Sequence, residues 1–161
     1  MLFIFASNND ELMKRFILAI CALFASICLF AQNDKADNIV GNFQFGSGIE
    51  AYKLNISKLA DGTYEGTVYW VADILDKDGN KYKDVKNPDK SKRDNPLDQT
   101  VLFSGLRYDS AKKIWGGTKI YDPQRGIRAK MTAEFKDEKT VVVTGTLLGF
   151  TEKVEWVKIQ E

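Results

Sequence analysis

The residues best suited to ligand chemistry lie in one polar stretch in the middle of the chain. Carboxylates, an amide and a guanidinium occur close together there: Asp84, Asn87, Asp89, Arg93 and Asp94. A guanidinium can bind a ligand carboxylate or phosphate through two parallel hydrogen bonds, so Arg93 is a candidate anchor, with Asn87 and Asp89 beside it at the rim of a site. In the alternative interpretation, Asn87-Pro88-Asp89 is an Asx-type turn and Arg93 fixes the loop by an ion pair.

A second polar segment, Tyr121-Asp122-Pro123-Gln124-Arg125-Gly126, has the composition of a tight turn. Proline presets φ at the second turn position, and glycine accepts the conformation that closes the turn. Asp122 is expected to accept backbone N–H groups within it. Tyr121 and Arg125 are candidate ligand contacts because binding residues often lie on loops. The alternative is that both simply belong to the turn and its solvent shell.

The segment Asp76-Lys77-Asp78-Gly79-Asn80 has the alternating side-chain oxygens of a calcium loop. An EF-hand places glycine sixth and a bidentate glutamate twelfth. Here the glycine is fourth and the twelfth residue is Asn87. A hairpin tip formed by Asp78-Gly79 is therefore favoured, and no metal site is expected.

Large aromatic side chains form a third group of candidates. They are Phe43, Phe45, Trp70, Phe103, Trp115, Tyr121 and Trp156. They would either line a pocket for a ring or acyl chain, or fill the interior of a small barrel. Ala129, Met131 and Ala133 would leave space for a cavity, whereas Trp70 and Trp156 would occupy it.

The side chains on which most enzymes depend are missing. The chain has no histidine, and its two cysteines, Cys21 and Cys28, lie near the start. No Gly-x-Ser-x-Gly elbow or nucleotide-binding glycine loop occurs. We therefore expect neither enzymatic activity nor a cofactor. The net charge is only +1 and the two signs are mixed, so a nucleic-acid partner is not expected.

The start of the chain has the pattern of a secretory signal peptide. Met13-Lys14-Arg15 leads into an apolar run over 16–30 that closes with Ala31. A run of about fifteen residues is too short to cross a bilayer as a helix. Residues 1–31 are thus predicted to be an upstream extension and signal peptide, and 32–161 a single exported domain without a membrane span, in a bacterial periplasm or cell envelope. The alternative is a lipid anchor on Cys28.

The elements that position these residues are predicted to be β-strands. From residue 39 onward apolar and polar residues alternate, interrupted by turn residues every eight to twelve positions. Tyr64, Gly66, Val68 and Trp70 share one face in this pattern. The segment 72–99 is too polar for a core strand and is predicted to be a long loop. About eight strands with short turns predict an all-β, antiparallel up-and-down barrel.

An ordered series of short motifs runs through this domain. It comprises Asp84-Val85-Lys86-Asn87-Pro88-Asp89, Arg93, Asn95-Pro96-Leu97, Leu102-Phe103-Ser104-Gly105-Leu106, Trp115-Gly116-Gly117, Ile120-Tyr121-Asp122-Pro123, Gly126, Val143-Thr144-Gly145 and Trp156. The series closely resembles the exported bacterial family called domain of unknown function 2147. The resemblance implies a lipocalin-like (calycin-type) barrel, related in shape to carriers of small apolar molecules; the family's activity is unassigned.

Two positions depart from the pattern of that family. Gly41-Asn42-Phe43 stands where the resemblance implies Gly-x-Trp, and Ile127-Arg128-Ala129 follows Gly126 where a Lys and a Tyr are usual. If that tyrosine contributes to a shared site, this chain lacks it.

Together these observations predict an exported binding protein for a small, partly apolar or amphipathic molecule, with the 72–99 loop as a lid. The residues predicted to contact the ligand are Trp70, Asn87, Asp89, Arg93, Trp115, Tyr121 and Arg125. The alternative is a cell-envelope protein-interaction module with a solid barrel and no ligand cavity.

Overall fold

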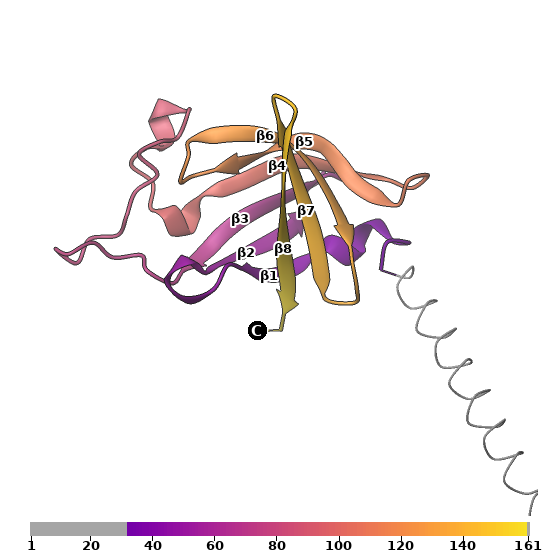
Figure 1. Cartoon of the computed structure of the whole chain (residues 1–161), viewed down its shortest axis with the longest axis horizontal. Helices are drawn as coiled ribbons and strands as arrows, with labels where there is room; N and C mark the ends of the chain where they lie inside the picture. Colours follow the sequence, from indigo (N-terminus) through magenta and orange to yellow (C-terminus); the bar gives the residue numbers. More distant parts are fainter. Residues whose placement is uncertain (1–31, 161) are drawn as a thin grey trace, which may run out of the picture.

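Eight antiparallel strands form a closed barrel in the computed structural model, which describes residues 32–160 (Figure 1). The strands are β1 (Gly41–Phe45), β2 (Tyr52–Lys58), β3 (Tyr64–Val71), β4 (Val101–Asp109), β5 (Ile114–Asp122), β6 (Ile127–Phe135), β7 (Thr140–Leu147) and β8 (Phe150–Ile159). Each pairs with the next, and β1 closes the barrel against β8. The predicted all-β barrel is confirmed. The predicted signal peptide lies outside the described residues.

Residues 32–160 contain four short 3-10 helices, one before β1 and three in the connections between strands. They are η1 (Ala36–Ile39), η2 (Gly48–Glu50), η3 (Lys90–Lys92) and η4 (Leu97–Gln99). Within residues 32–160, no helix has the length and apolar character needed to cross a membrane.

Large side chains fill the barrel interior. The fully buried residues of greatest volume in the core include Phe43, Tyr64, Phe103, Trp115 and Trp156. The rings of Phe103 and Trp156 stack with their centroids 6.0 Å apart. Gly66 has to be small, because a Cβ there would lie 2.3 Å from the Phe103 ring. Burial of these rings is the main source of stability in a domain without disulfides.

Trp70 departs from the predicted alternation. Tyr64, Gly66 and Val68 are buried as expected, but Trp70 is 40% exposed. The β2–β3 register shifts between Lys53 and Leu54, so that one extra residue lies in β3 opposite this point. Such a β-bulge changes the face onto which later side chains project. The expectation that Trp70 lines the interior is therefore wrong; its ring lies outside, with the Lys53 ammonium 5.2 Å from its centroid.

The segment before β1 closes one end of the barrel. The Asn33 side chain donates to the carbonyl of Phe135 at 2.9 Å and accepts from its N–H at 2.8 Å. The Trp115 indole donates to the Ala36 carbonyl at 2.9 Å, and Lys158 donates to the Asn38 carbonyl at 2.9 Å. The long β3–β4 loop and the β5–β6 turn lie at the opposite end.

The β3–β4 loop is ordered by its own hydrogen bonds. The Asp76 carboxylate accepts the N–H groups of Asp78 and Asn80, which forms the predicted hairpin tip. Further on, Asp84 N–H donates to the Asn95 carbonyl at 2.9 Å, so the loop folds back on itself before β4 begins. The predicted hairpin tip at Asp78-Gly79 and the predicted long loop over 72–99 are thus confirmed.

Candidate functional site

Tyr121 lies on the outer face of the barrel and is nevertheless 1% exposed. It pairs with Arg128 across β5 and β6, whereas the buried Met131 and Ala133 occupy the other face of β6. Directly opposed residues of antiparallel strands project to the same side, so Tyr121 and Arg128 both face outward. Tyr121 is buried there because the β3–β4 loop covers it.

A buried carboxylate connects the loop to this tyrosine. The Tyr121 hydroxyl donates to Asp84 Oδ1 at 2.6 Å, and the Asn87 amide donates to Asp84 Oδ2 at 2.7 Å. Asp84 and Asn87 are only 2% and 4% exposed. A carboxylate buried to this degree is stable only when donors satisfy it, and these two side chains do so.

The predicted Asx turn is present in the same segment. Asn87 Oδ1 accepts the N–H of Asp89 at 3.0 Å. Arg93 Nε donates to the Asn87 carbonyl at 2.8 Å, so Arg93 fixes the loop through a backbone oxygen. Asp89 in turn caps η3 by accepting from Ser91 N–H at 3.0 Å. These contacts hold the loop in one shape over Tyr121.

The β5–β6 turn is fitted against the loop at a second point. Gly126 has a φ of +72°, and a Cβ at this position would lie 2.8 Å from the Lys86 carbonyl oxygen. The Lys86 ammonium donates to the Gln124 carbonyl at 2.6 Å. Only glycine meets both requirements without strain, a positive φ and close backbone approach.

A small polar cavity of about 80 Å³ lies where the loop meets β4 and β6. Its lining residues are Asp84, Asn87, Lys92, Asn95, Gln99, Thr100, Val101 and Arg128. Thr100 is 4% exposed, and its hydroxyl has no hydrogen-bond partner within the described part of the chain. Burying a hydroxyl without a partner is costly, and this one belongs to a residue of the cavity wall. The cavity has room for a few water molecules or for one carboxylate or phosphate group.

Positive charge predominates around this cavity. Lys92 and Arg128 line it together with one carboxylate, Asp84, whose two oxygens already accept hydrogen bonds. The Arg128 guanidinium lies 5.4 Å from the centroid of the Tyr121 ring, within range of a cation–π contact. Burial and the hydrogen bond to Asp84 raise the pKa of Tyr121, so the phenol stays neutral and remains a donor.

The structure brings together four of the predicted site residues, Asn87, Asp89, Arg93 and Tyr121. Arg125 is outside this group. Its guanidinium forms ion pairs with Asp122 within the turn and with Glu152 on β8, the latter at 2.6 Å. Trp115 lies deep at the opposite end of the barrel beside Tyr108 and Phe135, far from the loop.

Sequence reasoning missed Thr100 and Arg128. A signal for Arg128 was present, because a hairpin that turns at residues 123–126 places residue 128 opposite Tyr121. The sequence carries no comparable signal for Thr100, because its place in the cavity wall depends on burial by residues distant in the sequence.

A closed eight-stranded up-and-down barrel is the architecture of the lipocalin-like fold. The chain belongs to the family described as "uncharacterized protein conserved in bacteria" (DUF2147), whose model matches residues 41–158. The resemblance inferred from the motifs is confirmed.

A solved structure with the same fold is protein HP1028 from Helicobacter pylori, described as belonging to the lipocalin family. It is 19% identical over 76% of this chain and 84% of that chain, with a TM-score of 0.59. No curated protein sequence matches the chain. Similarity at this level establishes a shared fold.

Proposed function

We propose that this protein is an exported binding protein for a small amphipathic molecule, whose polar end it holds in the cavity beneath the β3–β4 loop. The observation that carries the proposal is the cavity itself, which is lined by Lys92, Arg128 and Thr100, a residue whose buried hydroxyl has no partner among the described residues. Buried polar groups in folded proteins generally have hydrogen-bond partners, and a polar ligand in the cavity would supply donors and acceptors next to this residue.

The surrounding charges favour an anionic group, a carboxylate or phosphate. Arg128 offers a planar set of donors, and Lys92 adds a second cation. Asn95, Gln99 and the Thr100 hydroxyl supply neutral hydrogen-bonding groups.

We expect the apolar part of the ligand to contact side chains of the β3–β4 loop and not the interior of the barrel. The interior is filled by rings, as described above, so a deep apolar pocket has no support. Val85 and Tyr82 flank the buried Asp84 region and are 63% and 45% exposed. Exposed apolar side chains next to a polar cavity suit a molecule with one polar and one apolar end.

Export is supported by the charged head and short apolar run that precede Ala31. The domain after Ala31 contains no cysteine. It therefore needs no disulfide to be formed after transport, and we place it in the periplasm or cell envelope.

A second function, protein interaction in the cell envelope through a solid barrel, is favoured by the filled interior. The Phe103–Trp156 stack and the bulk of Trp115 leave the centre of the barrel packed. In that case the loop surface, and not the cavity, would carry the function.

Native mass spectrometry of mature protein recovered from a periplasm separates the two functions. We expect a small anionic molecule that co-purifies and is lost on solvent extraction. Arg128→Gln and Thr100→Val should weaken its retention. Arg107→Gln removes an exposed arginine of β4 that does not line the cavity. This control should retain the molecule as the unchanged protein does.

An apo mass for every variant, with no binding of added fatty acids or phosphate monoesters, would overturn the binding function and leave the interaction module. Retention that is equal in Arg128→Gln and Arg107→Gln would place the ligand elsewhere.

A further inference from the structure

The tip of the β7–β8 hairpin is unusually apolar for an exposed turn. Leu148 is 90% exposed and Phe150 is 83% exposed. Leu148 has a φ of +50° and Gly149 a φ of +87°, the conformation of a type I′ turn. Asparagine, aspartate or glycine is preferred at the first of these positions. Folding therefore does not account for a leucine here, either through burial or through turn geometry.

This hairpin projects beyond the barrel (Figure 1). Successive residues of β8 from Phe150 to Glu155 are all exposed, although neighbouring side chains of a strand point to opposite faces. Both faces of the hairpin are thus open to the surroundings near its tip. Leu148 in the turn and Phe150 immediately after it are therefore both accessible to a partner.

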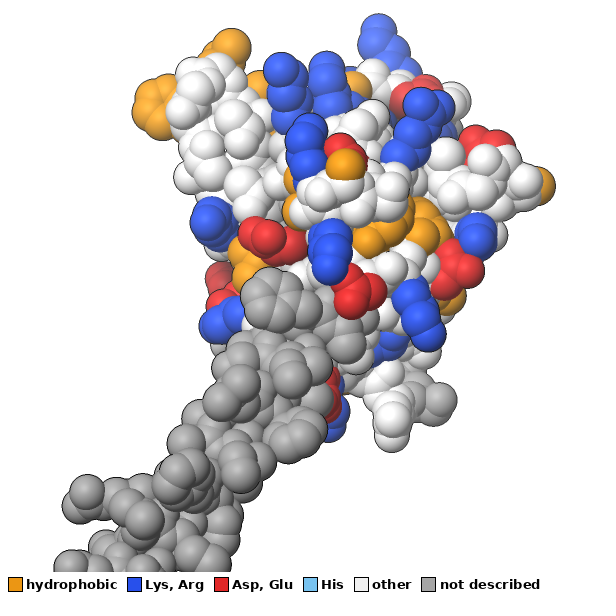
Figure 2. All heavy atoms as spheres, turned by 90° about the vertical axis from the view of Figure 1, so that its right-hand side faces the viewer, with side chains coloured by type: hydrophobic (Ala, Val, Ile, Leu, Met, Phe, Trp, Pro, Cys, Tyr) orange, Lys and Arg blue, Asp and Glu red, His pale blue; other side chains and the backbone are white. Residues whose placement is uncertain are grey.

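Beside the tip, the outer face of the sheet is basic. Lys119 and Lys130 are directly opposed across β5 and β6, and Lys130 is opposed to Thr146 on β7, two residues before Leu148. In the neighbouring outer row, Thr144 is opposed to Lys153 on β8. Figure 2 shows basic side chains grouped along the top of the molecule, with apolar side chains at the adjoining corner.

Lys119, Lys130 and Lys153 form no ion pair within the described part of the chain. By contrast, Arg125 and Lys136 are paired with Glu152 and Glu155. Like charges directly opposite one another across two strands destabilise a sheet. The stability of the fold therefore does not account for this arrangement.

We propose that this surface binds the face of an anionic lipid bilayer. Leu148 and Phe150 enter the interfacial region, while Lys119, Lys130 and Lys153 contact the headgroups. The combination of exposed apolar side chains with flanking lysines is the one that peripheral membrane segments use. The surface does not include the cavity beneath the loop, so this proposal stands independently of the small-molecule site.

Co-sedimentation with vesicles tests the proposal. We expect the mature protein to bind vesicles that contain phosphatidylglycerol, and the bound fraction to fall as the salt concentration is raised. It should not bind vesicles of phosphatidylcholine. The double variant Lys119→Gln/Lys130→Gln should lower the partition coefficient by roughly ten-fold or more, since each lysine near such a surface contributes about five-fold. The variant Leu148→Ser/Phe150→Ser should reduce binding by a similar or larger factor.

Matched control variants distinguish binding by this surface from non-specific binding to vesicles. Lys77→Gln/Lys90→Gln makes the same change in net charge on exposed lysines of the β3–β4 loop, and Ile49→Ser removes an apolar side chain that is 75% exposed in η2. Both should bind as the unchanged protein does. Equal loss in the controls, equal binding to neutral vesicles, or no binding at all would each overturn the proposal. An unchanged circular dichroism spectrum shows that each variant is folded.

Discussion

Tyr121 and Asp84 are 37 residues apart in the sequence and are joined by a 2.6 Å hydrogen bond on the outside of the barrel. The bond links strand β5 to the β3–β4 loop at a point where both partners are almost fully buried. A segment that would otherwise be a mobile connection thereby becomes the wall of a cavity. The loop and the β5–β6 hairpin act as one structural unit.

Replacing Tyr121 by phenylalanine tests the strength of this link. The change leaves one oxygen of the buried Asp84 carboxylate without its donor, which should cost about 1–3 kcal/mol in the free energy of unfolding measured with urea. Tyr82→Phe is the matched control, because Tyr82 is 45% exposed; its effect should stay within about 0.5 kcal/mol. Equal effects would mean that the loop is not held by this bond.

High pH should release the same contact. Burial and the Asp84 hydrogen bond raise the pKa of Tyr121 in the folded protein, and burial and Asp37 do the same for Tyr64. The folded state therefore keeps these protons more tightly than the unfolded chain. The stabilisation is complete below the unfolded value of about 10 and is lost as the pH rises through the folded pKa.

Absorbance of the phenolate measures this directly. Two of the six tyrosines should ionise only together with unfolding, and each of the variants Tyr64→Phe and Tyr121→Phe should remove one of them. Reversible ionisation of all six phenols near pH 10 in the folded protein would contradict the assignment.

Gly126→Ala should detach the loop from the hairpin. Alanine at this position combines an unfavourable positive φ with a Cβ 2.8 Å from the Lys86 carbonyl oxygen. Gly79→Ala, at the loop tip, has the same kind of φ but nothing within 4 Å. The backbone term of about 1–2 kcal/mol is common to both, so the excess loss of stability in Gly126→Ala reports the clash.

Limited proteolysis within residues 72–99 should also be faster in Gly126→Ala than in Gly79→Ala, because an undocked loop is a better substrate. Equal cleavage rates would show that the loop does not depend on this approach.

The two buried tryptophans should respond differently to replacement by phenylalanine. The Trp115 indole donates to the Ala36 carbonyl, whereas the Trp156 indole N–H has no partner among the described residues. Both substitutions remove similar apolar volume. Trp115→Phe should therefore be the more destabilising, by about 1 kcal/mol, in parallel urea denaturation experiments. A larger loss for Trp156→Phe would show that its indole has a partner in solution.

The barrel could be predicted because its strands follow a local rule. Alternation at Tyr52, Leu54 and Ile56, and again from Met131 to Phe135, is a property of neighbouring residues and survives folding. Trp70 departs from this alternation because a β-bulge in the pairing of β2 with β3 turns its side chain to the outer face of the sheet. The position of a bulge depends on the partner strand and so cannot be read from neighbouring residues.

The site was harder to predict because its parts meet only in three dimensions. Asn87, Asp89 and Arg93 are close in sequence, and their turn was recognisable from composition. That Tyr121 is buried on the outside of the barrel, and that Arg128 and Thr100 line one cavity near it, depends on the loop folding back over β5 and β6. No short pattern specifies contacts between such distant segments.

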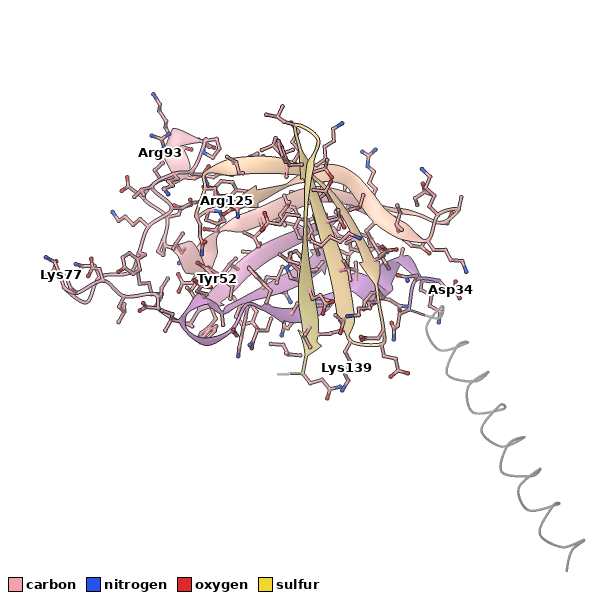
Figure 3. All side chains as sticks on the ribbon, in the orientation of Figure 1. Asp34, Tyr52, Lys77, Arg93, Arg125 and Lys139 are labelled. Atoms are coloured by element: carbon pink, nitrogen blue, oxygen red, sulfur yellow. The ribbon has the colours of Figure 1, made fainter. Side chains whose placement is uncertain are left out.

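Both ends of the described chain leave the barrel opposite the β3–β4 loop. Asn33 is fixed to Phe135, and Ile159 is paired with Asn42 at the start of β1. Figure 3 places Asp34 on the side away from Lys77 and Arg93. A sensor chip, bead or fluorescent fusion attached through either terminus would therefore leave the cavity facing solution. Immobilised protein should accordingly present the end that carries the cavity in one orientation.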